Sequence, residues 1–280
     1  MKNIVKYKND MNKLNFHGLR KNDMNLFMAI CSKVKEKGEN TVIIDFDYLR
    51  KISNYTGHTI DGFLKDLRIM SSKIMAVNCE ILNENGGFIL FHIFDKFIAD
   101  PENATLTVKI NSDFSWLLNE FTDKIRGYTT FELYEFVGLQ SKYAKNLYRI
   151  LKQWRTTGEF TFNSIDDFRL KLDVPETYTN KKMTQKVIKP AITEIQELDK
   201  SFKNFKCEPL YLHKRGKPLA GYKFTWTPES RENQKNLEQN NKSSIENKKS
   251  QNSFANFHQR EYDYESLEKE LLKIKSAEIN

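Results

Sequence analysis

Polar side chains that can pair with the edges of nucleic-acid bases gather in one short stretch, 180–189 (NKKMTQKVIK). A Gln or Asn amide can pair with adenine, a Lys ammonium can bind the acceptor edge of guanine, and a Thr can touch a thymine methyl group or a phosphate. We expect the following side chains to read bases: Asn180, Lys181, Lys182, Thr184, Gln185, Lys186 and Lys189. This set predicts that the stretch binds double-stranded DNA.

A second set of side chains has the charge and spacing to hold phosphate groups. Within the predicted helix that begins near Leu139, four basic residues from Lys142 to Lys152 recur at helical spacing and should form one exposed stripe. The expected phosphate contacts are Ser141, Lys142, Lys145, Arg149, Lys152, Lys214, Arg215, Lys217, Lys65 and Arg68. A single lysine is more often part of a solvated face, but the whole set favours backbone contacts that fix the register of a protein on DNA.

The chain lacks the motifs of common enzyme classes. A phosphate-binding loop needs Gly-Lys followed by Ser or Thr, and the only Gly-Lys pair, at 216–217, precedes a proline. The five histidines are isolated, and no Gly-x-Ser-x-Gly or His-Glu-x-x-His motif occurs. The carboxylate pair Asp166-Asp167 follows Ser164 at the spacing of a helix N-cap, which is the simpler interpretation. We therefore expect no enzyme activity, no cofactor and no metal.

Charge and composition agree with a cytosolic protein that has a surface for polyanions. The 280 residues carry a net charge of +8. Residues 229–280 hold nine of the 45 basic and ten of the 37 acidic residues, so the rest of the chain carries +9. No apolar signal core and no run long enough to cross a membrane is present. The three cysteines are far apart and are expected to be reduced thiols, so we predict a cytoplasmic protein with no membrane contact.

The elements that must position the base-reading stretch lie between residues 139 and 198. The pattern predicts a helix, a short strand, a second helix, a turn and a third helix. Apolar residues line one face of the first and third helices, as in a helix-turn-helix unit whose third helix enters the major groove. Pro190 leaves two alternatives: either the third helix kinks there, or it begins near Pro190 and 181–189 forms a separate turn.

The same order of elements occurs twice, which predicts an α+β protein with two tandem winged-helix domains. The first half reads as helix 19–37, strand 41–44, helices 46–54 and 59–74, a hairpin of strands 76–82 and 88–94, strand 104–110 and a helix in 111–119, after an extended lead-in at 1–18. The second half ends in strands 202–213 and 219–226, and Pro209 indicates an edge position or a bulge in the first of them. We place an N-terminal winged helix at 1–125 and a C-terminal one at 126–228.

The tail differs in composition. Residues 229–252 are almost entirely polar and predict a disordered linker. Residues 253–280 predict a short amphipathic docking motif, either packed on the body or free to bind a partner. Its anchors are expected to be Phe254, Phe257, Tyr262, Tyr264, Leu267 and Leu271.

Several separated motifs resemble those of the Rep initiators of iteron-containing, theta-replicating plasmids, of the type found in low-GC Gram-positive bacteria. The motifs are Leu139-x-Ser141-Lys142-Tyr143-Ala144-Lys145-x-Leu147-Tyr148-Arg149-x-Leu151-Lys152-Gln153, Phe168-Arg169-x-x-Leu172, Lys189-Pro190-Ala191-x-x-Glu194-Ile195, Asn25-Leu26-Phe27 and Asn111-x-x-Phe114-x-x-Leu117-Leu118-Asn119. They occur in the right order, and the likeness covers about residues 11 to 228.

The resemblance implies two winged helices, binding of direct repeats at a plasmid origin by the monomer, and help in opening the adjacent AT-rich DNA. It also implies recruitment of a host initiator, helicase loader or primase, and repression of the protein's own gene by a homodimer in equilibrium with the monomer. It assigns repeat reading to 180–189, backbone contacts and dimerisation to the N-terminal domain, and a kinked third helix to Pro190. Two alternatives remain: a tandem winged-helix transcription repressor without a replication role, and an adaptor that works through its tail.

Overall fold

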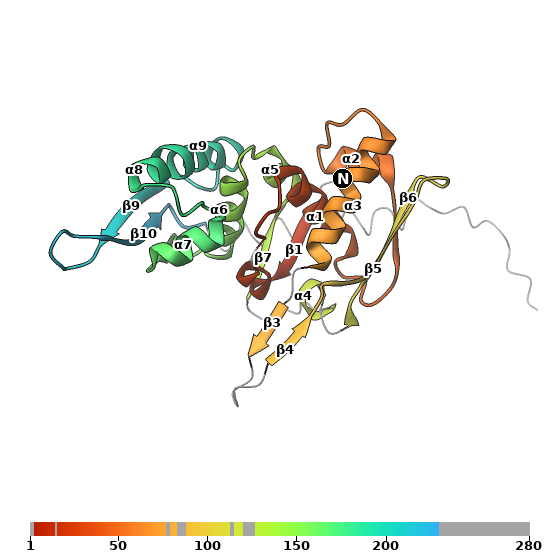
Figure 1. Ribbon diagram of the computed structural model, residues 1–280, viewed down its shortest axis with the longest axis horizontal. Coiled ribbons are helices and arrows are strands. Elements are labelled where there is room, and N and C mark those ends of the chain that lie inside the picture. The colour runs from red at the N-terminus through yellow and green to blue at the C-terminus, as the bar shows by residue number, and fades with distance from the viewer. Residues whose placement is uncertain are drawn as a thin grey trace, which may run out of the picture. The chain divides into compact units, whose positions relative to one another are not determined.

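The structure is a computed structural model that describes residues 3–14, 16–76, 79–82, 88–112, 115–119 and 127–229. Figure 1 shows its elements. The predicted linker at 229–252, apart from its first residue, and the whole predicted docking motif at 253–280 lie outside the described residues.

The first half contains the helix, strand, helix, helix and strand order that the sequence predicts. It comprises α1 (Lys21–Val34), β2 (Val42–Asp45), α2 (Phe46–Ile52), α3 (Ile60–Met75), β3 (Cys79–Leu82), β4 (Phe88–Phe91), β5 (Phe94–Asp100), β6 (Thr105–Ile110) and α4 (Ser115–Leu118). The strands β2, β6 and β5 form an antiparallel sheet in that order, and β3 pairs with β4. Side-chain caps fix two helix starts, because Asp45 accepts from the Tyr48 N–H and Thr59 accepts from the Gly62 N–H.

One boundary in the first half differs from the prediction. The predicted strand 88–94 is two strands, since β4 ends at Phe91 and β5 begins at Phe94. This error arose because an apolar run alone does not mark where the chain changes partner. The helix expected to start within 111–119 is present as α4.

The second half repeats the order around a second sheet. It comprises β7 (Tyr128–Glu132), α5 (Leu133–Gly138), α6 (Lys142–Gln153), β8 (Glu159–Phe162), α7 (Ile165–Leu172), α8 (Asn180–Met183), a π-helical turn (Thr184–Ile188), α9 (Lys189–Leu198), β9 (Lys206–Tyr211) and β10 (Leu219–Thr225). The sheet order is β8-β10-β9, so β9 is an edge strand and tolerates Pro209, as predicted. The Ser164 side chain accepts from the N–H groups of Asp166 and Asp167, which confirms the N-cap.

The expected extended lead-in at residues 1–18 is only partly extended, and it belongs to the fold. Residues Ile4–Lys8 form β1, which pairs antiparallel with β7, and Asn9–Lys13 form a 3-10 helix, η1. Val5 and Tyr7 are fully buried, and the Tyr7 hydroxyl donates to Asn12 Oδ1. The alternation of Val5 and Tyr7 with lysines was the signal of a strand, and the polar residues around it masked that signal.

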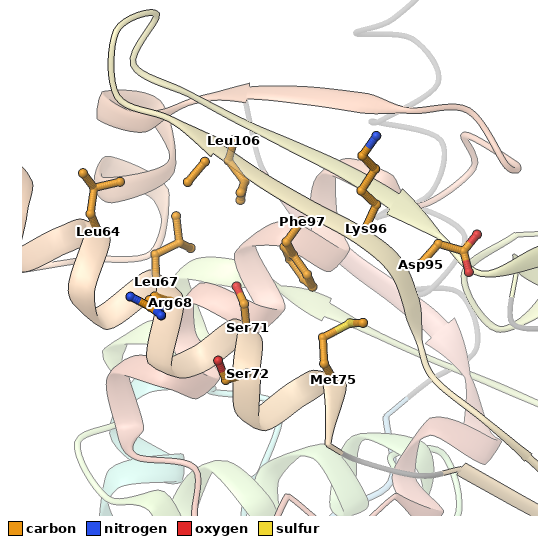
Figure 2. A pocket seen from close by; sticks show the side chains of 11 residues that line it. Leu64, Leu67, Arg68, Ser71, Ser72, Met75, Asp95, Lys96, Phe97 and Leu106 are labelled. Atoms are coloured by element: carbon orange, nitrogen blue, oxygen red, sulfur yellow. The ribbon is translucent and has the colours of Figure 1, made fainter.

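A hollow of about 590 Å³ lies between α3 and the strands β5 and β6. Figure 2 shows Phe97 of β5 pointing toward the side chains of α3, whereas Lys96 points away from them. Leucine and methionine side chains of α3 make half of its apolar lining, and Arg68 of the same helix lines it as well. The hollow therefore marks the inner face of the first sheet, opposite the solvent face of the same strands.

Candidate nucleic-acid interface

Three helices of the second half form the unit that presents the base-reading stretch. Helix α7 ends at Asp173, which adopts a left-handed conformation, and α8 begins seven residues later with Thr179 as its N-cap. Between them, the Arg169 guanidinium donates to the carbonyl oxygens of Pro175 (2.7 Å) and Tyr178 (2.6 Å). These bonds hold the turn at both ends, so the start of α8 has a defined position relative to α7.

The third helix is continuous through Pro190. The chain stays helical from Asn180 to Leu198, and the turn Thr184–Ile188 is wider than an α-helical turn because the Lys189 N–H donates to the Thr184 carbonyl, five residues back. Pro190 directly follows this wide turn and has no N–H to donate to the helix. Of the two alternatives for Pro190, the structure therefore has one distorted helix and no separate turn (Figure 1).

The expected base-reading side chains lie together on this helix and are accessible. Thr184 is half-buried and its hydroxyl donates to the Asn180 carbonyl, while the other six are exposed. Lys182 Nζ lies 4.1 Å above the centre of the Tyr178 ring. The helix is anchored on its other side by buried apolar residues: Met183, Val187, Ile188, Ala191 and Ile195.

The predicted basic stripe on α6 is wrong, because its central members are inside the protein. Lys145 is fully buried, its Nζ donates to the Phe136 carbonyl at 2.5 Å, and it lies 4.6 Å from the centre of the Phe136 ring. Burial lowers the pKa of Lys145 to about 7, although Glu194 nearby opposes this shift. A side chain in this position cannot reach a phosphate group.

Arg149 is buried as well. Its guanidinium carbon lies 4.1 Å above the Phe16 ring and Nη1 donates to the Met11 carbonyl at 3.4 Å. Burial lowers the pKa of Arg149 to about 10. Arg149 therefore packs the N-terminal segment against α6 and is not a phosphate contact.

Lys152 belongs to a buried polar cluster with Asp199, Tyr148 and Glu135. Lys152 Nζ lies 2.8 Å from Asp199 Oδ2, and the Tyr148 hydroxyl lies 2.7 Å from Glu135 Oε2 and 3.2 Å from Asp199 Oδ2. Burial raises the pKa of Glu135 to about 7, with repulsion from Asp199 acting in the same direction. Three of the four cations of the stripe thus have partners inside the protein, because α6 contacts β7 and η1 as well as α7 and α9.

The two remaining α6 candidates are also held by the protein. Ser141 is the N-cap of α6 and accepts from the Tyr143 N–H, while Lys142 Nζ lies 2.5 Å from Asp173 Oδ2. Nδ1 of His17, from the segment before α1, lies 2.5 Å from the other oxygen of Asp173. Asp173 therefore joins the N-terminal segment to the helix-turn-helix unit, a role that its sequence context did not indicate.

The other predicted phosphate contacts are accessible. Lys214, Arg215 and Lys217 are exposed in the turn that joins β9 to β10, where Gly216 and Lys217 adopt positive φ values of 83° and 41°. On α3, Lys65 and Arg68 are exposed on one face. The predicted DNA contacts that are accessible thus lie on the third helix and wing of the second half and on α3 of the first half.

The solvent face of the β2-β6-β5 sheet was not singled out by the sequence. Its central row pairs Ile43, Thr107 and Ile98 across three strands, and the two isoleucines are 68% and 42% exposed. A basic row, Lys109 and Lys96, flanks it on one side; an acidic row, Asp45 and Asp100 with Thr105, flanks it on the other. The alternation of inner and outer residues in these strands was the available signal.

Among the residues that the structure describes, no three or more His, Cys, Asp or Glu side chains are grouped so that they could hold a metal ion. In that same part of the chain, no helix has the length and apolar character that crossing a bilayer requires.

Comparisons with known proteins agree with this architecture. The family model described as "Initiator Replication protein, WH1" matches residues 4–152, and "Initiator Rep protein, WH2" matches residues 164–226. The chain is 33% identical over 230 residues to the "Probable replication protein rep" of Bifidobacterium longum (strain NCC 2705), covering 81% of this chain and 73% of that protein. It also shares the fold of the Pi initiator protein, solved in complex with iteron DNA, with a TM-score of 0.61 and 14% identity over 82% of this chain and 98% of that one.

Proposed function

This chain belongs to the family of initiator replication proteins, and we propose that it starts plasmid replication by binding direct repeats, called iterons, at the origin. The observation that carries the proposal is the exposed amide- and lysine-bearing stretch 180–189 at the start of the third helix of a winged helix. The Pi initiator, whose fold this chain shares, was solved in complex with iteron DNA. We assign base reading to that stretch because the first turns of such a helix enter the major groove.

The remaining contacts follow from the accessible cations. Lys214, Arg215 and Lys217 hold phosphates from the wing of the second domain, and Lys65 and Arg68 do so from α3 of the first. We assign residues 1–125 to the N-terminal domain and 126–228 to the C-terminal, repeat-reading domain. The protein acts in the bacterial cytoplasm, where it helps to open the AT-rich DNA beside the repeats.

The tail has a recruiting role in this proposal. Residues 253–280 bind a host initiator, helicase loader or primase, and residues 229–252 serve as a linker. Deletion of 229–280 should then abolish plasmid replication in the cell and leave repeat affinity in vitro unchanged. Loss of repeat affinity in the truncated protein would argue against this role.

We propose that the solvent face of the β2-β6-β5 sheet joins two copies into the dimer that represses the protein's own gene. A two-fold axis along the Ile43–Thr107–Ile98 row sets the basic row of one copy against the acidic row of the other. An interface of this kind is self-complementary, as closed dimers require. An exposed apolar row flanked by opposite charges also fits the usual anatomy of an interface, with an apolar centre and a polar rim.

The DNA proposal is tested by fluorescence anisotropy on a duplex of the repeats beside the gene and on its scrambled version, at near-physiological salt. Specific binding is typically about 10³-fold or more tighter than non-specific binding. Gln185→Ala should lower this ratio by the equivalent of about 1–3 kcal/mol, the value of one good base contact. Gln196→Ala is the matched control, because it removes the same side chain from the far end of the same helix. A wild-type ratio near one would refute repeat reading.

The dimer proposal is tested by sedimentation. Ile43→Glu should shift the protein to the monomer, because it places a charge in the centre of the apolar row. Leu170→Glu is the control, since Leu170 is 58% exposed on α7 and lies outside the proposed face. If both variants sediment like the wild type at concentrations where it dimerises, the face is not the interface.

Replication and repression are separated in the cell. A plasmid that carries only the repeats and the AT-rich segment should replicate when this protein is supplied from another gene. A transcription repressor without a replication role would leave such a plasmid unable to establish itself while still silencing its own promoter.

A further inference from the structure

The wide turn at Thr184–Ile188 contains one more residue than an α-helical turn. In an α-helix each N–H bonds to the carbonyl four residues earlier, whereas the Lys189 N–H bonds to the Thr184 carbonyl five residues earlier. Such single π turns are rare and occur frequently at functional sites. Here the turn lies inside the base-reading stretch, between Lys182 and Lys189.

The buried residues show why the extra residue is needed. Met183, Val187, Ala191 and Ile195 are all buried and follow each other at intervals of four. An α-helix turns by about 100° per residue, so twelve regular steps would place Met183 and Ile195 about 120° apart around the axis. If the wide turn absorbs one residue, eleven steps remain and the two side chains are only about 20° apart. The π turn thus brings the whole apolar row onto one face.

Ile188 is the extra residue between the core positions Val187 and Ala191. It is buried directly beside Val187, and without it the four core positions would follow at intervals of four, three and four, which is the spacing of one helix face. The exposed groups upstream of it, from Asn180 to Lys186, depend on this extra residue for their direction. Moving the wide turn along the helix would rotate the side chains it passes by about 100° relative to the core.

Pro190 explains why the wide turn stays where it is. Proline has no N–H, so residue 190 cannot donate to the Lys186 carbonyl, and its ring would clash with that carbonyl in a regular helix. Directly before Pro190 the wider turn is the arrangement that avoids this clash. A residue with an N–H at position 190 would allow regular α-helical hydrogen bonds to extend toward the N-terminus. The wide turn could then move to another position along the helix.

We propose that Pro190 is a positioning residue for base reading: it pins the wide turn between Thr184 and Ile188 and thereby sets the direction of Thr184, Gln185 and Lys186 toward the bases. This role rests on the proposed repeat reading. Pro190 itself makes no contact with DNA in the proposal. It acts only through the geometry of the helix that carries the reading groups.

The test compares anisotropy ratios, repeat duplex against scrambled duplex, for the wild type and three variants. Pro190→Ala should lower the ratio at least about tenfold, the value of one lost base contact, with scrambled-duplex affinity and its salt dependence unchanged. Pro209→Ala, on the edge strand β9, is the control for removal of a proline and should keep the ratio. Pro190→Ala combined with deletion of Ile188 makes the helix regular in its original phase and should recover most of the ratio.

The outcomes separate the two proposals. If the wild type does not distinguish the duplexes, repeat reading fails and the positioning role fails with it. If the wild type does distinguish them and Pro190→Ala does so within twofold, only the positioning role is overturned. If Pro190→Ala does not fold, as judged by circular dichroism, the combined variant decides: recovery of folding and of the ratio supports the role, and failure to recover the ratio overturns it.

Discussion

Lys145 gives a direct test of the buried face of α6, because its charge state should couple to stability. We consider Lys145→Met, which keeps an unbranched side chain one atom shorter and removes its charge. In the folded protein Nζ is fully buried against the Phe136 ring and carbonyl, and the charged groups that influence it are Glu194 and Lys21. Burial lowers the pKa of Lys145 from 10.5 to about 7.

The size of the effect follows from this difference in pKa. Between pH 7 and 8.5 the unfolded chain keeps its proton on Lys145, whereas the folded protein releases it. The free energy of unfolding therefore rises with pH in this window, and the two pKa values give a gain of about 1.5–2 kcal/mol. Lys145→Met lacks this contribution, so the stability of the variant relative to the wild type should fall by the same amount as pH rises. Other titrating groups, such as Glu135, are present in both proteins and cancel in the difference.

Urea unfolding followed by circular dichroism at pH 7.0 and 8.5 measures this difference. Lys203→Met is the control, because Lys203 is exposed and should show no such pH dependence. A stability difference between Lys145→Met and the wild type that is the same at both pH values would refute the reasoning. So would a drop of about one in the salt slope of DNA binding, which would mean that Lys145 contacts a phosphate.

Three further predictions concern the wing, the polar cluster and the second sheet. Arg215→Ala should weaken binding to repeat and scrambled duplexes alike and lower the salt slope by about one, measured by anisotropy from low to high salt; an effect on the repeat alone would contradict a phosphate role. Asp199→Asn should lower the free energy of unfolding by about 3–5 kcal/mol, measured in urea, because it leaves the buried Lys152 charge without its carboxylate; a neutral result would mean that the pair is not buried in solution. Gly221→Ala should lower the melting temperature by the equivalent of about 1–3 kcal/mol or more, because its Cβ would lie 1.8 Å from the Phe162 carbonyl oxygen; an unchanged melting temperature would contradict the close approach of β10 and β8.

Local chemistry made much of the fold predictable. Ser164 was identified as a helix N-cap because a serine followed three residues later by a carboxylate is the spacing of a capping box. Pro209 was placed at an edge because proline has no N–H to donate to a neighbouring strand. The winged-helix order followed from the alternation of helical and strand periodicity. Helical periodicity also predicted which residues of the base-reading stretch are exposed. Its apolar residues fall on one face of the helix, so its polar residues lie on the other.

The burial of Lys145, Arg149 and Lys152 was not predictable from periodicity. The pattern of α6 assigns its apolar residues to the inside and its cations to the outside, which holds only for a helix that is covered on one side. Helix α6 is covered on more sides, and the partners of its cations come from distant positions: the Phe136 carbonyl, the Phe16 ring and Asp199. Long basic side chains can be buried where their polar ends find such partners, and a single sequence does not reveal contacts at that separation.

The pairing of β1 with β7 has a consequence for synthesis on the ribosome. Ile4 pairs with Glu132 and Lys8 with Tyr128, so β1 finds its partner strand only after more than a hundred further residues have been made. At about 5–20 residues per second, this delay is on the order of ten seconds. During that time the apolar side chains of Val5 and Tyr7 have no strand to pack with, and a nascent chain is open to chaperones or to misassembly. Fragments cut before β7 should share this defect, so a stable N-terminal fragment must extend past Glu132.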